Sequence, residues 1–130
     1  MFEARAPNQF ESVFSAMIES RVDAMAMADD GMFLANLRAI ADVAASKRLP
    51  STGAKELAEA GGLIGYGVDF VQTYYRAAYF VDKILKGAKP GELPVEQPTK
   101  FEMVINLSAA KKLGLTITRD FQLIADDVIE

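Results

Sequence analysis

The sequence predicts an α/β fold, a doubly wound and mainly parallel sheet flanked by helices, and two observations support this. Short apolar segments typical of strands recur between longer segments whose apolar residues follow one face of a helix. The first four pairs run in the order β-α-β-α-β-α-β-α, and right-handed crossovers turn that order into a parallel sheet. The length of 130 residues fits one domain.

The first predicted pair is a strand at residues 2–6 followed by a helix. The strand candidate FEARA is closed by Pro7. Asn8 is then expected to cap the helix, with Glu11 three residues later as its capping-box partner. One face of this helix is predicted to be core, formed by Phe10, Val13, Phe14, Met17 and Ile18.

The second pair begins with a continuous run of small apolar residues at 24–28. Such a run is typical of a central parallel strand that is covered on both faces, and Asp29 and Asp30 end it. A helix is predicted over residues 31–47. Its apolar stripe is followed by Lys47 and Arg48, which are favourable at the negative end of a helix dipole.

The next segments are shorter. LPST reads as a short strand or turn, and the small helix around AKELAEAG is expected to end at Gly61 and Gly62. LIGYG is predicted to be a buried strand, and a long helix rich in tyrosine and phenylalanine follows it.

After residue 94 the pattern changes to that of a single strand and two short helices. Phe101, Met103 and Ile105 alternate with other side chains, which is the period of a strand. Pro98 makes the segment before it an edge strand or a connection. The two final helices are predicted at SAAKKLG and at residues 119–129.

Composition excludes several classes of function. The chain has no cysteine, which excludes disulfides and thiolate metal sites, and no histidine, the commonest general base and zinc ligand. A formal net charge of −4 argues against nucleic acid as a partner. The N-terminus lacks the basic and then apolar pattern of a secretion signal. We therefore expect no catalytic residues, no metal and no cofactor.

The aromatic helix leaves two interpretations open. Its apolar stripe is widened by Tyr75, Tyr79 and Phe80 until little polar face remains. It is either a well-buried core helix or a helix whose cover is another domain or another copy of the chain, because an exposed patch of that size would be a liability.

Three motifs in one register resemble a known family. The sequence has YG before the aromatic helix, then VDKILKGAKPGELPVEQPTKFE, then VINLSAAKKLGL. This part is similar to the C-terminal part of bacterial ABC-transporter substrate-binding proteins of the tryptophan/tyrosine type, which have the type I periplasmic-binding fold. The resemblance covers essentially the whole chain and less than half of the family's usual length.

The resemblance implies one lobe of a two-lobed periplasmic receptor that hands a small ligand to an ABC permease. Residues 1–68 would supply the βα units of the C-terminal lobe, residues 69–94 an interlobe helix and linker, and residues 95–130 a returning strand and the last helices. The aromatic helix would pack on the first lobe. The first lobe and a signal peptide are expected to be absent here, so the fragment is expected to form a homodimer or exchange segments.

Candidate ligand contacts follow from topology, because ligands of open parallel sheets bind beyond the carboxyl ends of the strands. Asp29 or Asp30 could receive a ligand amine or hydroxyl, although each could equally cap a helix. Ser51 and Thr52 could bond a carboxylate or serve as local caps. Tyr66 could stack on an aromatic or apolar ligand, or it could pack in the core. Gly67, which has no side chain, would let the backbone approach a ligand closely. The family's ligands, aromatic or branched amino acids, favour Tyr66.

An enzyme is the alternative. Asp29 and Asp30 could hold Mg²⁺ at a strand end, as in phosphoryl-transfer or receiver-like α/β domains. Such chemistry also calls for a lysine at a neighbouring strand end, and LIGYG offers none. The receptor is therefore the preferred prediction.

Overall fold

The computed structural model describes all 130 residues. They form two compact units, a larger one of residues 1–67 and 102–130 and a smaller one of residues 68–101.

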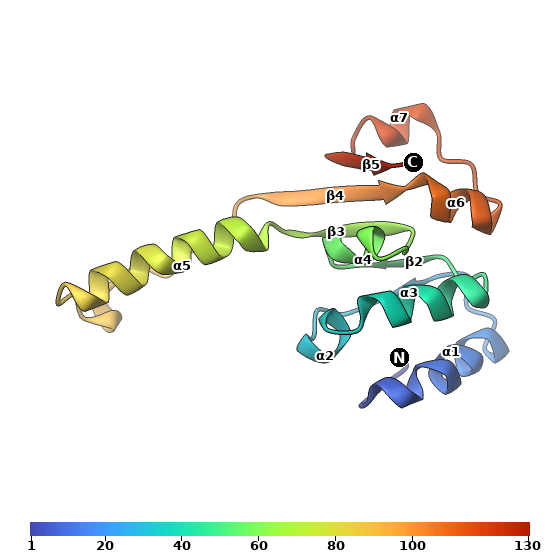
Figure 1. The fold of residues 1–130 in the computed structure, drawn as a ribbon, viewed down its shortest axis with the longest axis horizontal. Coiled ribbons are helices and arrows are strands. Elements are labelled where there is room, and N and C mark those ends of the chain that lie inside the picture. Colours follow the sequence, from blue (N-terminus) through green and yellow to red (C-terminus); the bar gives the residue numbers. More distant parts are fainter. The chain divides into compact units, whose positions relative to one another are not determined.

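The strands form one sheet in the order β1-β2-β3-β4-β5 (Figure 1). Their bounds are Met25–Ala26, Ser51–Gly53, Ile64–Val68, Phe101–Asn106 and Asp127–Ile129. The first three strands are parallel to one another, and β5 is parallel to β4. The junction between β3 and β4 is antiparallel, because Asn106 N–H donates to the Leu63 carbonyl at 3.0 Å while Asp69 N–H donates to that of Lys100 at 3.4 Å. The predicted mainly parallel α/β sheet is confirmed.

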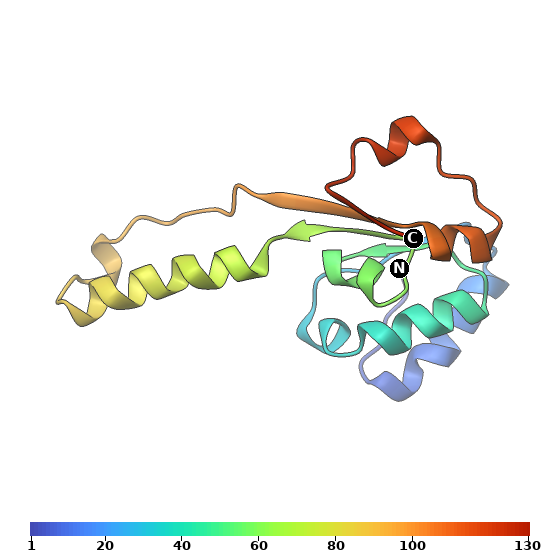
Figure 2. The same ribbon diagram turned by 45° about the horizontal axis from the view of Figure 1, so that its top comes forward.

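Helices of the larger unit pack mainly through α1 and α3, which lie together on one side of the strands (Figure 2). The helices are α1 (Phe10–Glu19), α2 (Gly31–Leu34), α3 (Leu37–Ser46), α4 (Lys55–Glu59), α6 (Leu107–Leu113) and α7 (Arg119–Gln122). Their main core is apolar and well buried: Phe10, Phe14, Met25, Ile40, Ala41, Ala44, Leu49 and Leu57. This core joins α1, α3 and α4 to β1, so it fixes where the strand ends lie.

The N-terminal predictions were wrong in three respects. Residues 2–6 form no strand. Pro7–Gln9 form a 3-10 turn that includes Asn8, so Asn8 is not the cap and α1 begins at Phe10, one residue later than predicted. β1 is two residues long and pairs with β2 alone. Met25 is buried and Ala26 is exposed, so this strand is an edge strand covered on one face, not a central one.

The predicted helix over residues 31–47 is divided in two at Asn36. The Asn36 side chain donates to the Met32 carbonyl at 2.7 Å, the acceptor that its own N–H would use in a continuous helix. That N–H donates to Phe33 instead. The local side-chain bond thus ends α2 and lets α3 begin in a new direction.

The prediction of a last helix over residues 119–129 was also wrong beyond Gln122, where α7 ends. Residues 127–129 form β5 against β4, with Ile105 opposite Val128. Asp126 secures this pairing, because its carboxylate accepts the Met103 N–H at 2.7 Å and its own N–H donates to the Met103 carbonyl. Pairing with a neighbouring strand overrides the helical pattern of the sequence.

The smaller unit consists of α5 (Phe70–Leu85), the 3-10 turn Pro90–Glu92 and an extended return segment. Asp69 caps α5 by accepting the Gln72 N–H at 3.1 Å. No residue of α5 is buried, and Tyr74 and Tyr75 are 73% and 72% exposed. Of the two interpretations of the aromatic helix, the well-buried core helix is therefore wrong for this chain.

Candidate functional site

The carboxyl ends of β1, β2 and β3 meet at one edge of the sheet, because these strands are parallel and in register. Residues 27–30 follow β1, and Ala54 and Lys55 follow β2. Tyr66 and Gly67 lie in β3 just beyond Gly65, the last residue that pairs with β2. We call these residues the carboxyl edge. It brings together four of the six predicted ligand residues: Asp29, Asp30, Tyr66 and Gly67.

Asp29 and Asp30 differ in what they do. Asp30 caps α2, since its carboxylate accepts the Met32 N–H at 2.8 Å. Asp29 is exposed and makes no such bond. Capping therefore accounts for Asp30, and Asp29 is the carboxylate that the fold leaves available at this edge.

Ser51 and Thr52 lie inside β2, not in a loop after it. Ser51 is paired with Met25 and is only 4% exposed, which favours a packing role. Thr52 is half-buried, and its carbonyl accepts the Met27 N–H at 2.8 Å. The loop that follows β2 begins one residue after Gly53, so the sequence placed these two side chains too near the edge.

Tyr66 and Gly67 lie in the second half of β3, and Gly67 is beside the start of α4. The Tyr66 side chain is 57% exposed, so the alternative of core packing does not describe it. A Cβ on Gly67 would lie 3.4 Å from the Lys55 nitrogen, and one on Gly65 only 2.2 Å from the Lys55 carbonyl oxygen. The close approach that the glycines permit is therefore made by the backbone of α4.

A charged pair at this edge was not found from the sequence. The Lys55 ammonium lies 2.5 Å from a Glu102 carboxylate oxygen, and the two side chains are 22% and 18% exposed. The residues are 47 positions apart, so no local pattern could have joined them. The pair connects the start of α4 to β4.

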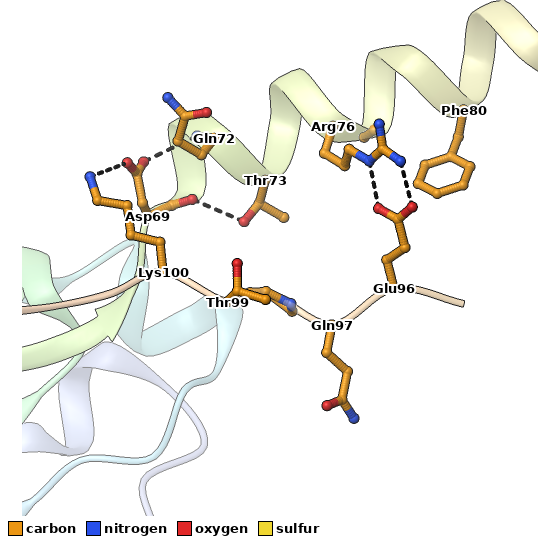
Figure 3. A pocket seen from close by; sticks show the side chains of 11 residues that line it. Asp69, Gln72, Thr73, Arg76, Phe80, Glu96, Gln97, Thr99 and Lys100 are labelled. Atoms are coloured by element: carbon orange, nitrogen blue, oxygen red, sulfur yellow. Dashed lines mark hydrogen bonds and ion pairs between the residues drawn. The ribbon is translucent and has the colours of Figure 1, made fainter. Parts of the chain in front are cut away.

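The smaller unit has a pocket of its own, with a volume of about 630 Å³, between the first half of α5 and residues 96–100 (Figure 3). Two ion pairs cross it. Arg76 makes a bidentate pair with Glu96, and Lys100 lies 3.4 Å from the Asp69 carboxylate. The Arg76 guanidinium also lies 4.0 Å from the centroid of the Tyr79 ring. The charges of this pocket are mutually paired, so they join the helix to the return segment.

The Arg76–Glu96 pair has a clear electrostatic effect. Hydrogen bonding to the guanidinium holds the pKa of Glu96 below its usual value, and the same contact raises the pKa of Arg76. The pair was not predicted from the sequence, because its members are 20 residues apart.

The structure contains no group of three His, Cys, Asp or Glu side chains arranged to hold a metal ion. No helix is both long enough and apolar enough to span a membrane. For the Mg²⁺ alternative, the predicted carboxylate ligands are only Asp29 and Asp30, and Asp30 already caps α2.

Residues 1–129 match the model of the family described as ABC transporter substrate binding protein. The chain belongs to this family. Members of the ABC transporter substrate-binding family are receptors and not enzymes, so the enzyme alternative is set aside. The sheet order and the helices fit one lobe of the type I periplasmic-binding fold.

Two solved structures resemble the chain strongly. A conserved domain protein from Vibrio cholerae superposes with a TM-score of 0.88 at 27% identity, over 96% of this chain and 42% of that one. An ABC domain from Streptococcus pneumoniae in complex with L-Trp gives the same TM-score and identity, over 98% and 43%. A curated relative, a tyrosine-binding protein from Clostridioides difficile, is 23% identical over 96 residues, 73% of this chain and 28% of that protein. The chain thus spans less than half the length of each of these proteins.

Proposed function

We propose that this chain forms the ligand-binding lobe of the solute receptor of an ABC importer, and that the ligand is an aromatic or branched amino acid. The observation that carries the proposal is the similarity to an ABC domain solved in complex with L-Trp, with a TM-score of 0.88 over 98% of the chain. The tyrosine-binding relative supports the same class of ligand.

The carboxyl edge supplies the contacts in this proposal. Tyr66 stacks its exposed ring on the ligand side chain. Asp29 accepts the ligand ammonium, with the second oxygen of Asp30 as a further acceptor. Gly67 lies at this edge beside Lys55, and Thr52 lies inside β2. Because Ser51 is buried, we assign it to packing.

The rest of the receptor follows from the same proposal. Residues 69–94, with α5, serve as the interlobe helix and linker, and a first lobe covers the exposed face of α5 and closes over the ligand. The closed receptor delivers its ligand to a membrane permease from the periplasm. These partners agree with the exposure of α5, which has no buried residue in this chain.

Ligand binding is tested by heteronuclear NMR or calorimetry with L-tryptophan, L-tyrosine and L-leucine. One lobe offers half of a cleft, so we expect dissociation constants of about a millimolar, or roughly −4 kcal/mol. Tyr66→Ala should weaken the best ligand about tenfold, and Tyr66→Phe should bind as the wild type does. Leu115→Ala, an exposed change after α6 at the other edge, is the matched control. Stabilisation by Mg²⁺ with acetyl phosphate, and by none of the amino acids, would refute the proposal.

A further inference from the structure

The Lys55–Glu102 ion pair stands at the carboxyl edge, where a ligand is expected to bind. Lys55 comes two residues after β2 and begins α4, so it lies between the residues that follow β1 and those of β3. It is the only cationic residue of the carboxyl edge. Its ammonium lies 2.5 Å from the Glu102 carboxylate, and both side chains are mostly buried. Salt screens such a pair much less than it screens an exposed pair.

The glycines of β3 let Lys55 reach this partner. A Cβ on Gly67 would lie 3.4 Å from the Lys55 backbone nitrogen, so α4 begins against this face of β3. The hydrogen bonds at the two ends of the β3–β4 junction set an antiparallel register in which Glu102 lies opposite Gly67. Opposite residues direct their side chains to the same face. The Lys55 side chain therefore crosses β3 beside Gly67, where no side chain blocks it, and meets Glu102 on β4.

The charges of the carboxyl edge favour one end of an amino acid over the other. Asp29 and Asp30 attract the ligand ammonium and repel its carboxylate. Ser51 and Thr52 were predicted to bond that carboxylate, but both lie inside β2 and Ser51 is buried. A ligand carboxylate at this edge is therefore favoured only beside Lys55.

We propose that Lys55 binds the α-carboxylate of the ligand and so selects amino acids over the corresponding amines. This inference rests on the proposed function, because it names the partner of one group of the amino acid. An ammonium donates up to three hydrogen bonds, so it can bridge Glu102 and a ligand carboxylate. Tyr66 directs its ring to the other face of β3, because successive side chains alternate. The ring of the ligand and its carboxylate are thus recognised by separate residues.

Two ligands isolate the carboxylate: L-tryptophan, and tryptamine, which is the same molecule without it. Chemical-shift titration of the full 130-residue chain gives both dissociation constants. We call the value for tryptamine divided by that for L-tryptophan the carboxylate ratio, and we expect it to be about ten. Lys55→Met keeps a linear side chain without the charge and should bring the ratio close to one. The protein change and the ligand change remove the same contact, so their effects should not add.

Lys47→Met is the matched control. Lys47 also pairs with a carboxylate, that of Glu11 at 2.6 Å, and its side chain is partly buried. It follows the last residue of α3 and precedes β2, so it lies near the amino end of that strand. Its loss removes the same charge from the same unit and should leave the carboxylate ratio unchanged. Tyr66→Ala should weaken both ligands alike, since both carry the indole ring.

Two double variants keep the test decisive if Lys55→Met fails to fold because Glu102 stays buried without its partner. Lys55→Met with Glu102→Leu removes both charges and should fold, with a carboxylate ratio close to one. Lys55→Glu with Glu102→Lys keeps the pair but moves the cation to β4. It should keep the stability of the wild type in urea unfolding without restoring the ratio.

Three results would overturn the inference. They are a wild-type carboxylate ratio of one or less, an unchanged ratio when Lys55 is replaced by methionine, and a ratio of about ten in the exchanged pair. In each of them L-tryptophan still binds the wild-type chain. Failure of the proposed function looks different and overturns both, because neither L-tryptophan, L-tyrosine nor L-leucine then gives a saturable shift.

Discussion

Gly65 in β3 shows how little space separates β3 from the start of α4. A Cβ at this position would lie 2.2 Å from the Lys55 carbonyl oxygen, a backbone atom that cannot move without displacing α4. The sequence indicated that a glycine here permits a close approach, but it could not tell a ligand from a neighbouring element. The structure shows that the element is α4.

The close packing at Gly65 predicts a large effect of a small change. Gly65→Ala should lower the free energy of unfolding by about 3 kcal/mol, because the added methyl forces α4 away from β3. Gly31→Ala is the control, since a Cβ there meets nothing within 4 Å and alanine favours the helix that begins at this residue. We expect it to be neutral or to stabilise by up to about 1 kcal/mol. Urea unfolding of the three proteins compares them, and equal loss in both variants would contradict the packing argument.

Asn106 at the end of β4 serves two elements at once. It is 6% exposed, and its side-chain amide donates to the Ala58 carbonyl of α4 at 2.9 Å. Its side-chain oxygen accepts the Ala109 N–H in the first turn of α6 at 2.8 Å. Asn106→Ala removes a cap and leaves a buried carbonyl without its donor. It should cost about 2–3 kcal/mol of stability.

The matched control for that cap is Thr118, which caps α7 at an exposed site by accepting the Phe121 N–H at 3.3 Å. Thr118→Ala should cost only about 0.5–1 kcal/mol, because water can replace the lost acceptor. A smaller loss for Asn106→Ala than for Thr118→Ala, measured by thermal or urea unfolding, would count against the role given to burial.

The Arg76–Glu96 pair makes the smaller unit sensitive to pH. Hydrogen bonding to Arg76 lowers the pKa of Glu96 in the folded chain. The contribution of the pair is therefore complete above the ordinary glutamate pKa and is lost as the pH falls through the lowered value. A ¹³C NMR titration of the Glu96 carboxyl should give a pKa below that of a free glutamate.

Arg76→Leu should return the Glu96 titration to the ordinary range. Arg119→Leu changes an exposed arginine outside the smaller unit and should leave it unmoved. If Glu96 titrates at the ordinary value in the wild-type chain, the pair does not persist in solution.

The elements differ in how far the sequence predicted them. The long helix α5, with its clear apolar stripe, was predicted in type and place, whereas α3 is only the second part of the helix predicted over residues 31–47. α6 also ends as expected, at Gly114 with φ +73°. The failures at residues 2–6, 24–28 and 127–129 all concern strands, whose formation depends on a neighbour that a local pattern does not contain.

The residues of the candidate site were also predicted only where a local pattern or the strand order was sufficient. Topology placed Asp29, Asp30, Tyr66 and Gly67 at one edge, because the order of parallel strands could be read from the chain. Ser51 and Thr52 were expected in the loop after the second strand, but they lie inside β2, which begins at Ser51. The pair of Lys55 and Glu102 could not be found, because it joins elements that only the fold brings together.

At the scale of the whole molecule, the exposed face of α5 is the most conspicuous feature. Its apolar residues include Val71, Tyr74, Tyr75, Tyr79, Val81, Ile84 and Leu85, each at least 41% exposed. A patch of this kind on a free chain is expected to find a partner. For the isolated 130-residue chain, a second copy is the available partner.

We therefore expect the isolated chain to dimerise, with a mass near twice 14.1 kDa in light scattering at high concentration. Replacing Tyr74 and Tyr75 by lysine should shift it to the monomer. The control replaces Leu123 and Ile124, which are 73% and 65% exposed outside α5, and should leave the dimer intact. A stable wild-type monomer at high concentration would contradict this expectation.

The central claim is that amino acids bind at the carboxyl edge of β1, β2 and β3. Chemical-shift mapping of the labelled chain with L-tryptophan tests it most directly. The account predicts saturable shifts of the amides of Asp29, Asp30, Tyr66 and Gly67, with little change in β5. Shifts confined to other surfaces, or none up to the solubility of the ligand, would contradict it.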